Sequence, residues 1–456
     1  MDRTINDFIR PGLRAHLVGV GGVSMSPLAE VLHGAGVAVT GSDMQESAAV
    51  AHLRSLGIPV VIGHLPQSVE GTHCVIRTAA VHDDNPEIAA ALAAGIPVFE
   101  RAQAWGAIMS HYKNALCVAG THGKTTTTSM CTHIFLAAQR DPSVMIGGVL
   151  PALGAGHRVG KGDTIILESC EYCNSFLSFL PTVAVILNVD ADHLDFFKDL
   201  EDIKHSFRRF AALVPDDGFV VADLDDPNTM DALKGLERQV VTFGLEEGDV
   251  HAANLTWVNG FASFDVVARG ETVTRVELSV PGVHNVRNAL AACAAALCLK
   301  VPAAAIAEGL NAFQGAGRRF EKKGEYHGAV VYDDYAHHPD ELHALLSTVN
   351  TLGYDRVVCA FQPHTYTRTA ALFDRFVEEL KLPHLTIVAE IYAAREQNTL
   401  GISSKDLADR IPGSIYCADL EEVTARLARL ARPGDLILTV GAGDIYRAGE
   451  ALVALD

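Results

Sequence analysis

The stretch Gly120-Thr121-His122-Gly123-Lys124-Thr125-Thr126-Thr127-Thr128 decides how the middle of this chain folds. It follows the apolar run 115–119, which has the pattern of a buried parallel strand, and it leads into residues 129–138, which have the pattern of a helix. Glycines let backbone N–H groups approach phosphate oxygens, and the start of a helix adds a partial positive charge. We therefore expect a polyphosphate site in which Lys124 reaches the terminal phosphates and Thr125 holds Mg²⁺.

The spacing of this loop leaves an alternative open. Val118 stands where the commonest eight-residue phosphate-binding pattern has its first glycine, so the loop is shorter than that pattern. The alternative is an ordinary strand-to-helix turn with a solvated lysine. We favour the phosphate site because the strand, the glycines and the lysine–threonine pair occur together.

Composition limits the classes of protein to consider. At 456 residues the chain is too long for one core, and we expect two or three domains. No segment approaches the roughly 20 apolar residues that span a bilayer, and the N-terminus lacks the apolar core of a signal peptide. Nine cysteines, an odd number, indicate reduced thiols in a cytoplasm. The net charge of −19 argues against a nucleic-acid partner, although donors gathered in a cleft can still bind anionic small molecules.

The first segment, residues 1–112, has the pattern of half a doubly wound α/β sheet. A strand over 15–20 runs into a turn with Gly19, Gly21 and Gly22, and a helix follows over 28–32. The next strand, 37–40, leads to Asp43, so a nucleotide site is expected at these strand ends. Ser24 replaces the third glycine of a dinucleotide fingerprint, which leaves both NAD and a UDP-sugar open. Further strands are expected at 60–62, 74–77 and 98–99.

The second segment, residues 113–316, carries acidic groups where strands end. We expect its next strand after the loop at 164–167, ending in Glu168-Ser-Cys-Glu171, and another at 183–187, ending in Asn188-Val-Asp-Ala-Asp-His193-Leu-Asp195. Carboxylate and imidazole groups beside a phosphate loop suit a magnesium site. Asp199 is expected only to cap a helix. Later come a strand-like run over 255–280 and a helix over 285–299, where Asn285 and Asn288 suit either an adenine edge or a helix cap.

The third segment, residues 317–456, is again α/β, with strands expected at 330–332, 357–361, 386–389 and 436–440. The first of these strands is followed by Asp333-Asp-Tyr-Ala-His-His-Pro339 and the second by Gln362-Pro-His-Thr-Tyr-Thr-Arg-Thr369. Aromatic, imidazole and guanidinium groups therefore gather at the carboxyl ends of strands, where α/β proteins place their sites.

With these motifs in hand, the whole chain resembles the Mur ligases, the ATP-dependent family that builds the peptide stem of bacterial cell-wall precursors. The resemblance implies three α/β domains: a Rossmann-like UDP-binding domain, a central P-loop ATPase-type domain and a Rossmann-like C-terminal domain. The motifs on which the resemblance rests are Gly120–Thr126, Glu168–Glu171, Asn188–Asp195, His284–Asn288 and Asp333–His338. The chain is most similar to members that join L-alanine to UDP-N-acetylmuramate, on the basis of Gly19–Ser26, Gly41–Asp43, Asp84–Glu87 and Phe361–Thr369. The recycling ligase that attaches a preformed tripeptide to the same sugar nucleotide ranks second.

The resemblance implies that the muramate carboxylate attacks the γ-phosphate of ATP, and that the amine of L-alanine then attacks the acyl phosphate. The implied catalytic residues are Lys124, Glu168, His193, Arg319 and His337, with Thr125, Glu168 and His193 around Mg²⁺. The implied ATP-binding residues are Gly120, Thr121, His122, Gly123, Lys124, Thr125, Thr126, Asn285, Asn288, Arg319 and Asp334.

The resemblance also assigns the other two substrates. Tyr335, His337 and Arg368 would contact L-alanine, because a guanidinium matches a carboxylate bidentately. Thr365 stands where some members carry a second arginine, which leaves glycine and serine open as alternative amino acids. In the Glu168–Glu171 motif, Cys170 stands where many members have an acidic residue. The oligomeric state is expected to be a monomer or homodimer. The residues implied for the UDP-sugar are Gly19, Gly21, Gly22, Ser24, Met25, Ser26, Asp43, His64 and Thr78.

Three rival classes explain fewer of these motifs. An NAD-dependent dehydrogenase accounts for the first glycine turn and Asp43 but not for Gly120–Thr128. A P-loop switch or motor subunit leaves the third segment without a role. A zinc or redox site at Cys170 and Cys173 lacks a second cysteine pair at matching spacing.

Overall fold

The computed structural model of the chain describes residues 4–78, 81–193, 196–394 and 396–456. Leu194 and Asp195, the last residues of one predicted motif, lie outside the described residues. The described residues form three β-sheets. The chain divides into two compact units, the first made of Met1–Ala252, Val266–Thr274 and Arg287–Leu310, and the second of Ala253–Asp265, Arg275–Val286 and Asn311–Asp456.

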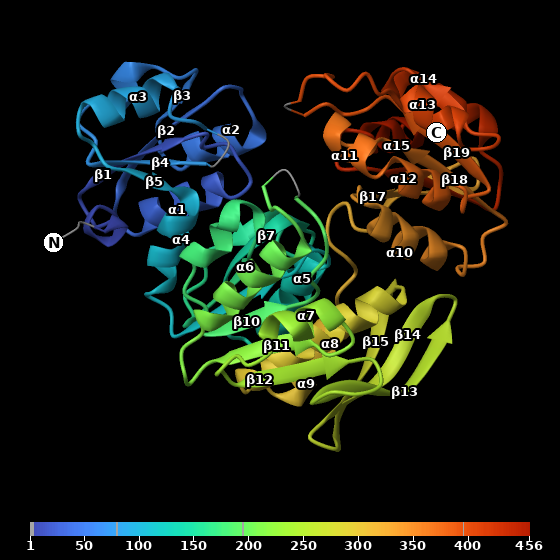
Figure 1. Cartoon of the computed structure of the whole chain (residues 1–456), viewed down its shortest axis with the longest axis horizontal. Helices are drawn as coiled ribbons and strands as arrows, with labels where there is room; N and C mark the ends of the chain where they lie inside the picture. The colour runs from blue at the N-terminus through green and yellow to red at the C-terminus, as the bar shows by residue number, and fades with distance from the viewer. Residues whose placement is uncertain (1–3, 79–80, 194–195, 395) are drawn as a thin grey trace. The chain divides into compact units, whose positions relative to one another are not determined.

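The first sheet is fully parallel, in the order β3-β2-β1-β4-β5. β1 ends at Val18, two residues before the predicted end, because Gly19 turns the chain with φ of 79°. Figure 1 shows α3 on one side of this sheet and α1 and α4 on the other. The elements are η1 (Ile5–Asp7), β1 (Arg14–Val18), α1 (Met25–Gly34), β2 (Ala38–Asp43), α2 (Ala48–Ser55), β3 (Val60–Ile62), η2 (Pro66–Val69), β4 (Cys74–Arg77), α3 (Pro86–Ala93), β5 (Val98–Glu100) and α4 (Arg101–Met109).

The sheet behind the phosphate loop has the order β12-β11-β10-β6-β9-β7-β8 within the first unit. It is parallel except for β8. Asp199 caps α6 by accepting a hydrogen bond from Asp202 N at 3.0 Å, as predicted. The elements are β6 (Asn114–Ala119), α5 (Lys124–Ala137), β7 (Ser143–Leu150), β8 (Ala155–Arg158), β9 (Thr164–Glu168), η3 (Tyr172–Ser178), β10 (Val183–Ile186), α6 (Leu200–Ala212), β11 (Phe219–Asp223), α7 (Pro227–Leu233) and β12 (Val240–Gly244).

One prediction for this sheet was wrong. The strand at 164–167 is not the next one after the loop, because β7 and β8 intervene. Gly147 and Gly148 interrupt the apolar pattern of β7, and glycine weakens a strand signal. The predicted helix is confirmed as α5, which begins at Lys124 and includes the threonines that precede residue 129.

One hydrophobic core runs through the first unit. It joins Leu28 of α1 and Trp105 of α4 to Phe176 of η3 and Phe207 and Phe210 of α6. Phe176 stacks on Phe210 with ring centroids 4.5 Å apart. The first sheet and the sheet behind the loop are therefore packed together as one body, which fixes their strand ends relative to each other.

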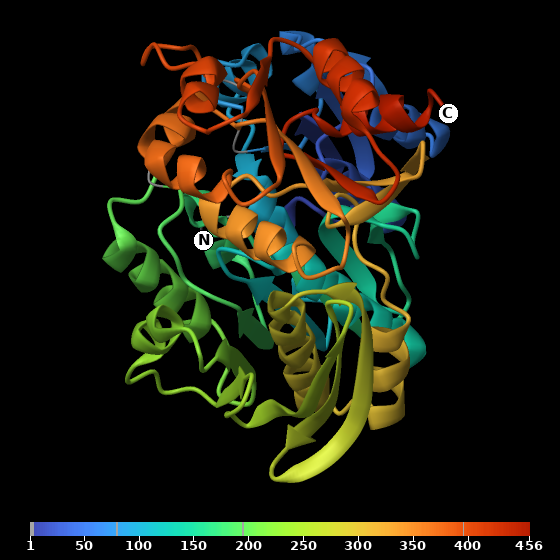
Figure 2. The same ribbon diagram turned by 90° about the vertical axis from the view of Figure 1, so that its right-hand side faces the viewer.

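Of the remaining strands in the described residues, β13, β14 and β15 each have residues in both units, and the strands of the C-terminal sheet lie in the second unit. The run predicted over 255–280 forms β13, β14 and β15, and the C-terminal sheet has the order β16-β17-β21-β18-β19-β20, antiparallel only at β16. Separate hydrophobic cores cover its two faces, one under α10, α12 and α13 and the other under α14 and α15. Figure 2 shows the corresponding orange and red helices on opposite sides of these strands.

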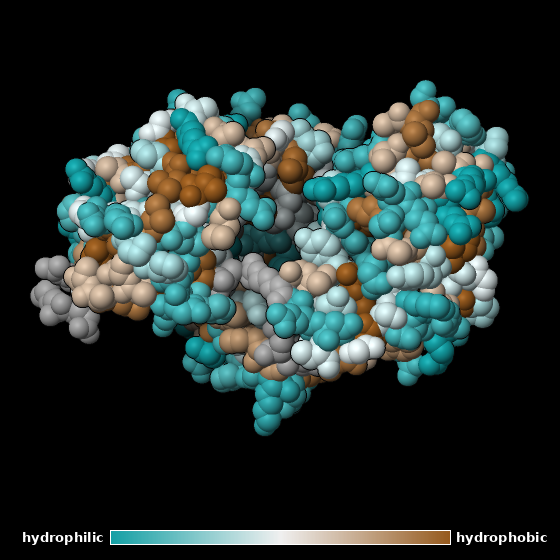
Figure 3. All heavy atoms as spheres, turned by 90° about the horizontal axis from the view of Figure 1, so that it is seen from above, coloured by the Kyte–Doolittle hydropathy of each residue, from teal (hydrophilic) through white to brown (hydrophobic). Residues whose placement is uncertain are grey.

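The bounds of the remaining elements are β13 (Val250–Val258), β14 (Phe261–Ala268), β15 (Glu271–Pro281), α8 (Val283–Cys298), α9 (Ala303–Asn311), β16 (Glu321–Tyr326), β17 (Ala329–Asp334), α10 (Pro339–Val349), β18 (Arg356–Phe361), α11 (Tyr366–Ala371), α12 (Phe373–Glu379), β19 (Leu385–Ala389), α13 (Ser404–Asp409), β20 (Ile415–Cys417), α14 (Leu420–Leu430), β21 (Asp435–Val440) and α15 (Tyr446–Val453). On the face shown in Figure 3, hydrophilic residues predominate and hydrophobic ones form small patches. Among the described residues, none of the helices is long and apolar enough to cross a bilayer.

Candidate functional site

The phosphate loop lies between β6 and α5, at the carboxyl end of the parallel sheet. Gly123 has φ of 85°, and a Cβ at this position would lie only 2.6 Å from Asn288 Oδ1. A side chain here would therefore meet both backbone strain and a steric clash. This close approach also places Asn288 of α8, one of the predicted ATP-binding residues, directly against the loop.

Asn188, at the end of β10, holds the loop in its shape. Its Oδ1 accepts from His122 N at 2.7 Å, its Nδ2 donates to His122 O at 3.1 Å, and its carbonyl accepts from Thr121 N at 3.1 Å. Asp190 N donates to Thr121 Oγ1 at 2.9 Å. Asn188 begins the motif that leads to His193, but its part in holding the loop was not predicted from the sequence. The strand end therefore positions both the loop and the imidazole that follows it.

Lys124, the first residue of α5, folds back over the loop. Its Nζ donates to Gly120 O at 2.5 Å and Thr121 O at 3.1 Å, and lies 3.0 Å from Glu171 Oε2. Burial alone would lower the pKa of Lys124, but the charges of Glu171 and Glu168 outweigh it, so the pKa is raised above its usual range. The lysine is therefore held charged at the point where a terminal phosphate would arrive.

Glu171, predicted only as one of the acidic groups at the end of a strand, lies beside Lys124. It is buried, and its Oε1 also lies 3.9 Å from His193 Nε2. The Tyr172 ring lies against that imidazole, with centroids 4.7 Å apart. The only signal in the sequence was its position as the second glutamate of Glu168–Glu171. Its carboxylate thus lies between two predicted catalytic residues, Lys124 and His193.

Glu168, at the end of β9, faces the same helix start. Its carboxylate accepts from Thr125 Oγ1 at 2.9 and 3.1 Å and from Gly147 N at 2.6 Å. A hydroxyl, carboxylates and an imidazole are the donors that suit a hard divalent cation with water completing its shell. Thr125, Glu168 and His193, which the sequence analysis placed around Mg²⁺, thus fit such an ion by their chemistry. Thr126 lies in the first turn of α5.

The glycine turn after β1 lies at the carboxyl end of the first sheet. Gly21 N donates to Asp43 Oδ2 at 2.8 Å, so the carboxylate predicted to bind a ribose also shapes the turn. Ser24 Oγ contacts Met145 Sδ of β7 at 2.9 Å and accepts from Trp105 Nε1 at 3.1 Å. The turn is therefore tied to β7, the strand whose Gly147 donates to Glu168.

The other residues predicted for the UDP-sugar lie around the same turn. Met25 and Ser26 are buried at the start of α1. The Thr78 methyl packs against Gly19, and Gly22 N donates to Gly19 O at 3.2 Å.

A buried polar cluster lies beside this turn. Glu87 is fully buried, and its Oε2 accepts from Ser42 Oγ at 2.5 Å and lies 3.0 Å from His64 Nδ1. Its Oε1 lies 3.5 Å from His16 Nε2. Burial opposes the charge of Glu87, but these hydrogen bonds outweigh it and lower the pKa of its carboxyl to about 2. His64, predicted in the uridine pocket, is thus oriented by a permanent carboxylate.

The second unit brings other predicted residues together around the end of β17. Arg319 lies 3.7 Å from Glu341 and 5.2 Å from the centroid of the Tyr335 ring. Asp334 accepts from Phe320 N at 2.7 Å and from Ala336 N at 2.8 Å, and burial raises the pKa of its carboxyl to about 6. Asn285, by contrast, donates to Pro281 O at 2.7 Å, so its amide is used by the backbone before α8.

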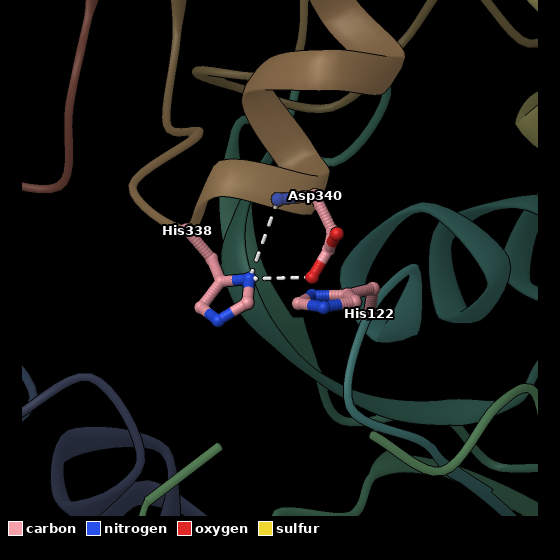
Figure 4. A group of neighbouring side chains, drawn as sticks. All are labelled: His122, His338 and Asp340. Atoms are coloured by element: carbon pink, nitrogen blue, oxygen red, sulfur yellow. Dashed lines mark hydrogen bonds and ion pairs between the residues drawn. The ribbon is translucent and has the colours of Figure 1, made fainter. Parts of the chain in front are cut away.

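The imidazole of His337, at the end of β17, is the predicted amino-acid contact whose neutral form burial favours. Burial lowers the pKa of His337 to about 4; Glu341 opposes this, whereas Arg368 of α11 adds to it. His337 Nδ1 lies 3.0 Å from Tyr335 O. Figure 4 shows the neighbouring His338 at the start of α10, with its Nδ1 3.1 Å from Asp340 Oδ2. The same nitrogen caps the helix by accepting from Asp340 N. His337 therefore offers a neutral ring beside the guanidinium of Arg368.

Comparison with known proteins gives a consistent result over the whole chain. Models of the Mur ligase family, catalytic domain, the Mur ligase middle domain and the Mur ligase, glutamate ligase domain match residues 14–113, 118–296 and 318–443. A UDP-N-acetylmuramate–L-alanine ligase from Caldanaerobacter subterraneus subsp. tengcongensis is 47% identical over 96% of each chain, and one from Clostridium novyi is 44% identical over 96% of each. A crystal structure of UDP-N-acetylmuramate-alanine ligase from Thermotoga maritima matches with a TM-score of 0.82 and 29% identity over 97% of this chain and 99% of the other.

Proposed function

Because the chain belongs to the Mur ligase family, we propose that it is the ATP-dependent ligase that joins L-alanine to UDP-N-acetylmuramate. The observation that carries the proposal is the 47% identity to a ligase of that name over 96% of both chains. The three α/β segments would then divide the substrates: 1–112 binds the UDP-sugar, 113–316 binds ATP, and 317–456 binds the amino acid. We place the reaction in the cytoplasm, with the enzyme as a monomer or homodimer.

The first step forms an acyl phosphate. A carboxylate oxygen of the muramyl group attacks the γ-phosphorus, the bond from that phosphorus to the β–γ bridging oxygen breaks, and ADP leaves with the electron pair. Lys124 enters this step already charged, because Glu171 raises its pKa, and it neutralises charge on the transferring group. Asn188 would keep the loop in shape during this step, because it accepts from the N–H groups of Thr121 and His122 and donates to His122 O.

Thr125, Glu168 and His193 would hold Mg²⁺, and the ion would supply charge stabilisation on the phosphate oxygens. Thr125 and Glu168 already lie within hydrogen-bonding distance of each other, so two oxygen ligands converge on one place. Glu171 then serves Lys124 rather than the ion. We assign Asn285 and Asn288 to the adenine and Arg319 and Asp334 to the phosphate end of ATP.

The second step forms the amide. The amine nitrogen of L-alanine attacks the acyl carbon, the tetrahedral intermediate collapses as the bond from carbon to the phosphate oxygen breaks, and the leaving phosphate takes up the proton that the amine gives up. We assign Arg368 to the carboxylate of L-alanine and Tyr335 and His337 to positioning its amine. His337 is suited to this because burial keeps its ring neutral, so it does not repel an ammonium group before deprotonation.

The test is phosphate release from ATP with UDP-N-acetylmuramate and each amino acid in turn. We expect release that requires both the sugar nucleotide and L-alanine, with ADP as the second product. Release that requires the tripeptide L-alanyl-γ-D-glutamyl-meso-diaminopimelate instead would assign the chain to the recycling ligases. Formation of AMP and pyrophosphate would exclude the acyl-phosphate route.

A further inference from the structure

Two arginines lie at the carboxyl edge of the first sheet, and only one of them is neutralised. Arg77, the last residue of β4, pairs with Asp83 at 2.5 Å and with Glu100 at 2.9 Å. Arg101 follows β5 directly and begins α4. It makes no hydrogen bond or ion pair through its side chain with any other residue in the described part of the chain. The carboxylate nearest in sequence, Glu100, is engaged by Arg77.

Arg101 is also partly buried. Burial lowers the pKa of its guanidinium, and the negative charge of Glu100 only partly opposes this. Charged side chains that are removed from water are normally paired, because the free energy lost with their hydration must be offset by an opposite charge or hydrogen bonds. A guanidinium left without a partner at a strand end is therefore available for an anion, and its fork matches a carboxylate or a phosphate.

The packing of α4 shows which part of the first unit Arg101 faces. Trp105 lies four residues later, on the same face of the helix, and its indole donates to Ser24 of the glycine turn. α4 also packs on η3, where a Cβ at Gly106 would overlap the carbonyl oxygen of Ser178. Cys170, next to Glu171, is near enough to act electrostatically on Arg101. Arg101 thus lies between the glycine turn and the residues around Lys124.

We propose that Arg101 binds the carboxylate of the muramyl group of the sugar nucleotide and holds it for attack on the γ-phosphate. This inference rests on the proposed function. The proposed function assigns the pyrophosphate of the same substrate to a different place, the glycine turn and the start of α1. Arg101 lies toward Cys170 and Glu171, the side from which the carboxylate must meet the phosphate held by Lys124. Conversion to the acyl phosphate turns the carboxylate into an acyl group whose carbonyl oxygen is a weaker acceptor, and the bidentate contact with the guanidinium is lost.

The test compares three ligands on the full-length protein by isothermal titration calorimetry. UDP-N-acetylglucosamine and UDP share the nucleotide and pyrophosphate of UDP-N-acetylmuramate but lack its carboxylate. We expect Arg101→Gln to weaken UDP-N-acetylmuramate binding by about 10- to 100-fold, the usual range for a hydrogen bond to a charged group, while UDP and UDP-N-acetylglucosamine change by less than about twofold. Arg101→Lys should restore part of the loss, since it keeps the charge without the fork.

Arg77→Gln is the matched control, because this arginine lies on the same sheet edge but is already paired. It should leave the preference for UDP-N-acetylmuramate over UDP-N-acetylglucosamine unchanged. Equal weakening of all three ligands by Arg101→Gln would mean a pyrophosphate contact and would overturn the proposal, as would no change in any of them. If the unaltered protein itself fails to bind UDP-N-acetylmuramate, the proposed function fails, and that result is separate from any effect of Arg101.

Discussion

The phosphate loop and the end of β17 each bury a basic side chain, and the two side chains end in opposite charge states. In the loop, buried Glu171 keeps Lys124 charged and raises its pKa. At the end of β17, burial and the charge of Arg368 lower the pKa of His337 to about 4, and Glu341 does not outweigh them. The comparison shows that a buried group keeps its charge only where an opposite charge or hydrogen-bonding partners lie beside it. It also matches the chemistry, because phosphoryl transfer needs a fixed positive charge whereas attack by an amine does not.

Removing the charged group of the loop should have the largest effect. Lys124→Ala should lower the rate of phosphate release by about 10²- to 10³-fold or more, the usual loss when a donor to developing charge is removed. Binding of UDP-N-acetylmuramate, measured by calorimetry, should stay within about twofold, because the glycine turn is held by its own contacts with Trp105 and Asp43. A variant that still ligates at a near-normal rate would show that Lys124 is not the phosphate-binding lysine.

Removing the counter-charge tests why Lys124 stays charged. Glu171→Gln should slow phosphate release by about 10- to 100-fold, because a buried cation loses its partner. Glu171 raises the pKa of Lys124, so its removal should lower that pKa, and activity should be lost at a lower pH on the alkaline side. The measurement is the pH profile of kcat for the variant and the unaltered protein. Profiles with the same alkaline limb would mean that the loop carbonyls alone keep the lysine charged.

The sequence predicted most of the fold and the loop side of the site for clear physical reasons. Apolar runs and strand-end motifs located the parallel strands, and the glycines and Lys124 identified the phosphate loop. β7 was missed because its glycines conceal the apolar pattern. The roles of Asn188 and Glu171 could not be predicted, since each depends on which strands are neighbours in the sheet. Arg101 was missed for a related reason, because its lack of a partner is visible only when the pairing of Arg77 with Glu100 is known.

Glu87 is a buried carboxylate, opposite in charge to Lys124, and it tests whether its neighbours keep a buried group charged. Glu87→Gln should lower the free energy of unfolding near neutral pH by about 1–3 kcal/mol, because Ser42 and the His64 ring lose a charged partner. The folded pKa of Glu87 is about 2, below its usual 4.5, so its stabilisation is complete above pH 4.5 and is lost as pH falls toward 2. Urea unfolding at a series of pH values should show the two proteins converge over that range. A difference that stays constant down to pH 2 would contradict the low pKa.

The smallest expected effect on activity comes from replacing His337, the neutral side chain of the pair compared above. His337→Asn should lower kcat/KM for L-alanine by about 3- to 10-fold, the worth of a neutral hydrogen bond, and should leave the KM for ATP unchanged. Because the pKa of His337 is about 4, its ring is neutral at any higher pH, and the ratio of the two proteins' kcat/KM values should be flat above about pH 5. The ratio cancels the titration of L-alanine itself, which both proteins share. A ratio that instead changes around pH 6.5 would show that this imidazole keeps its ordinary pKa. The contrast between a neutral His337 at the end of β17 and a charged Lys124 beside Glu171 would then fail.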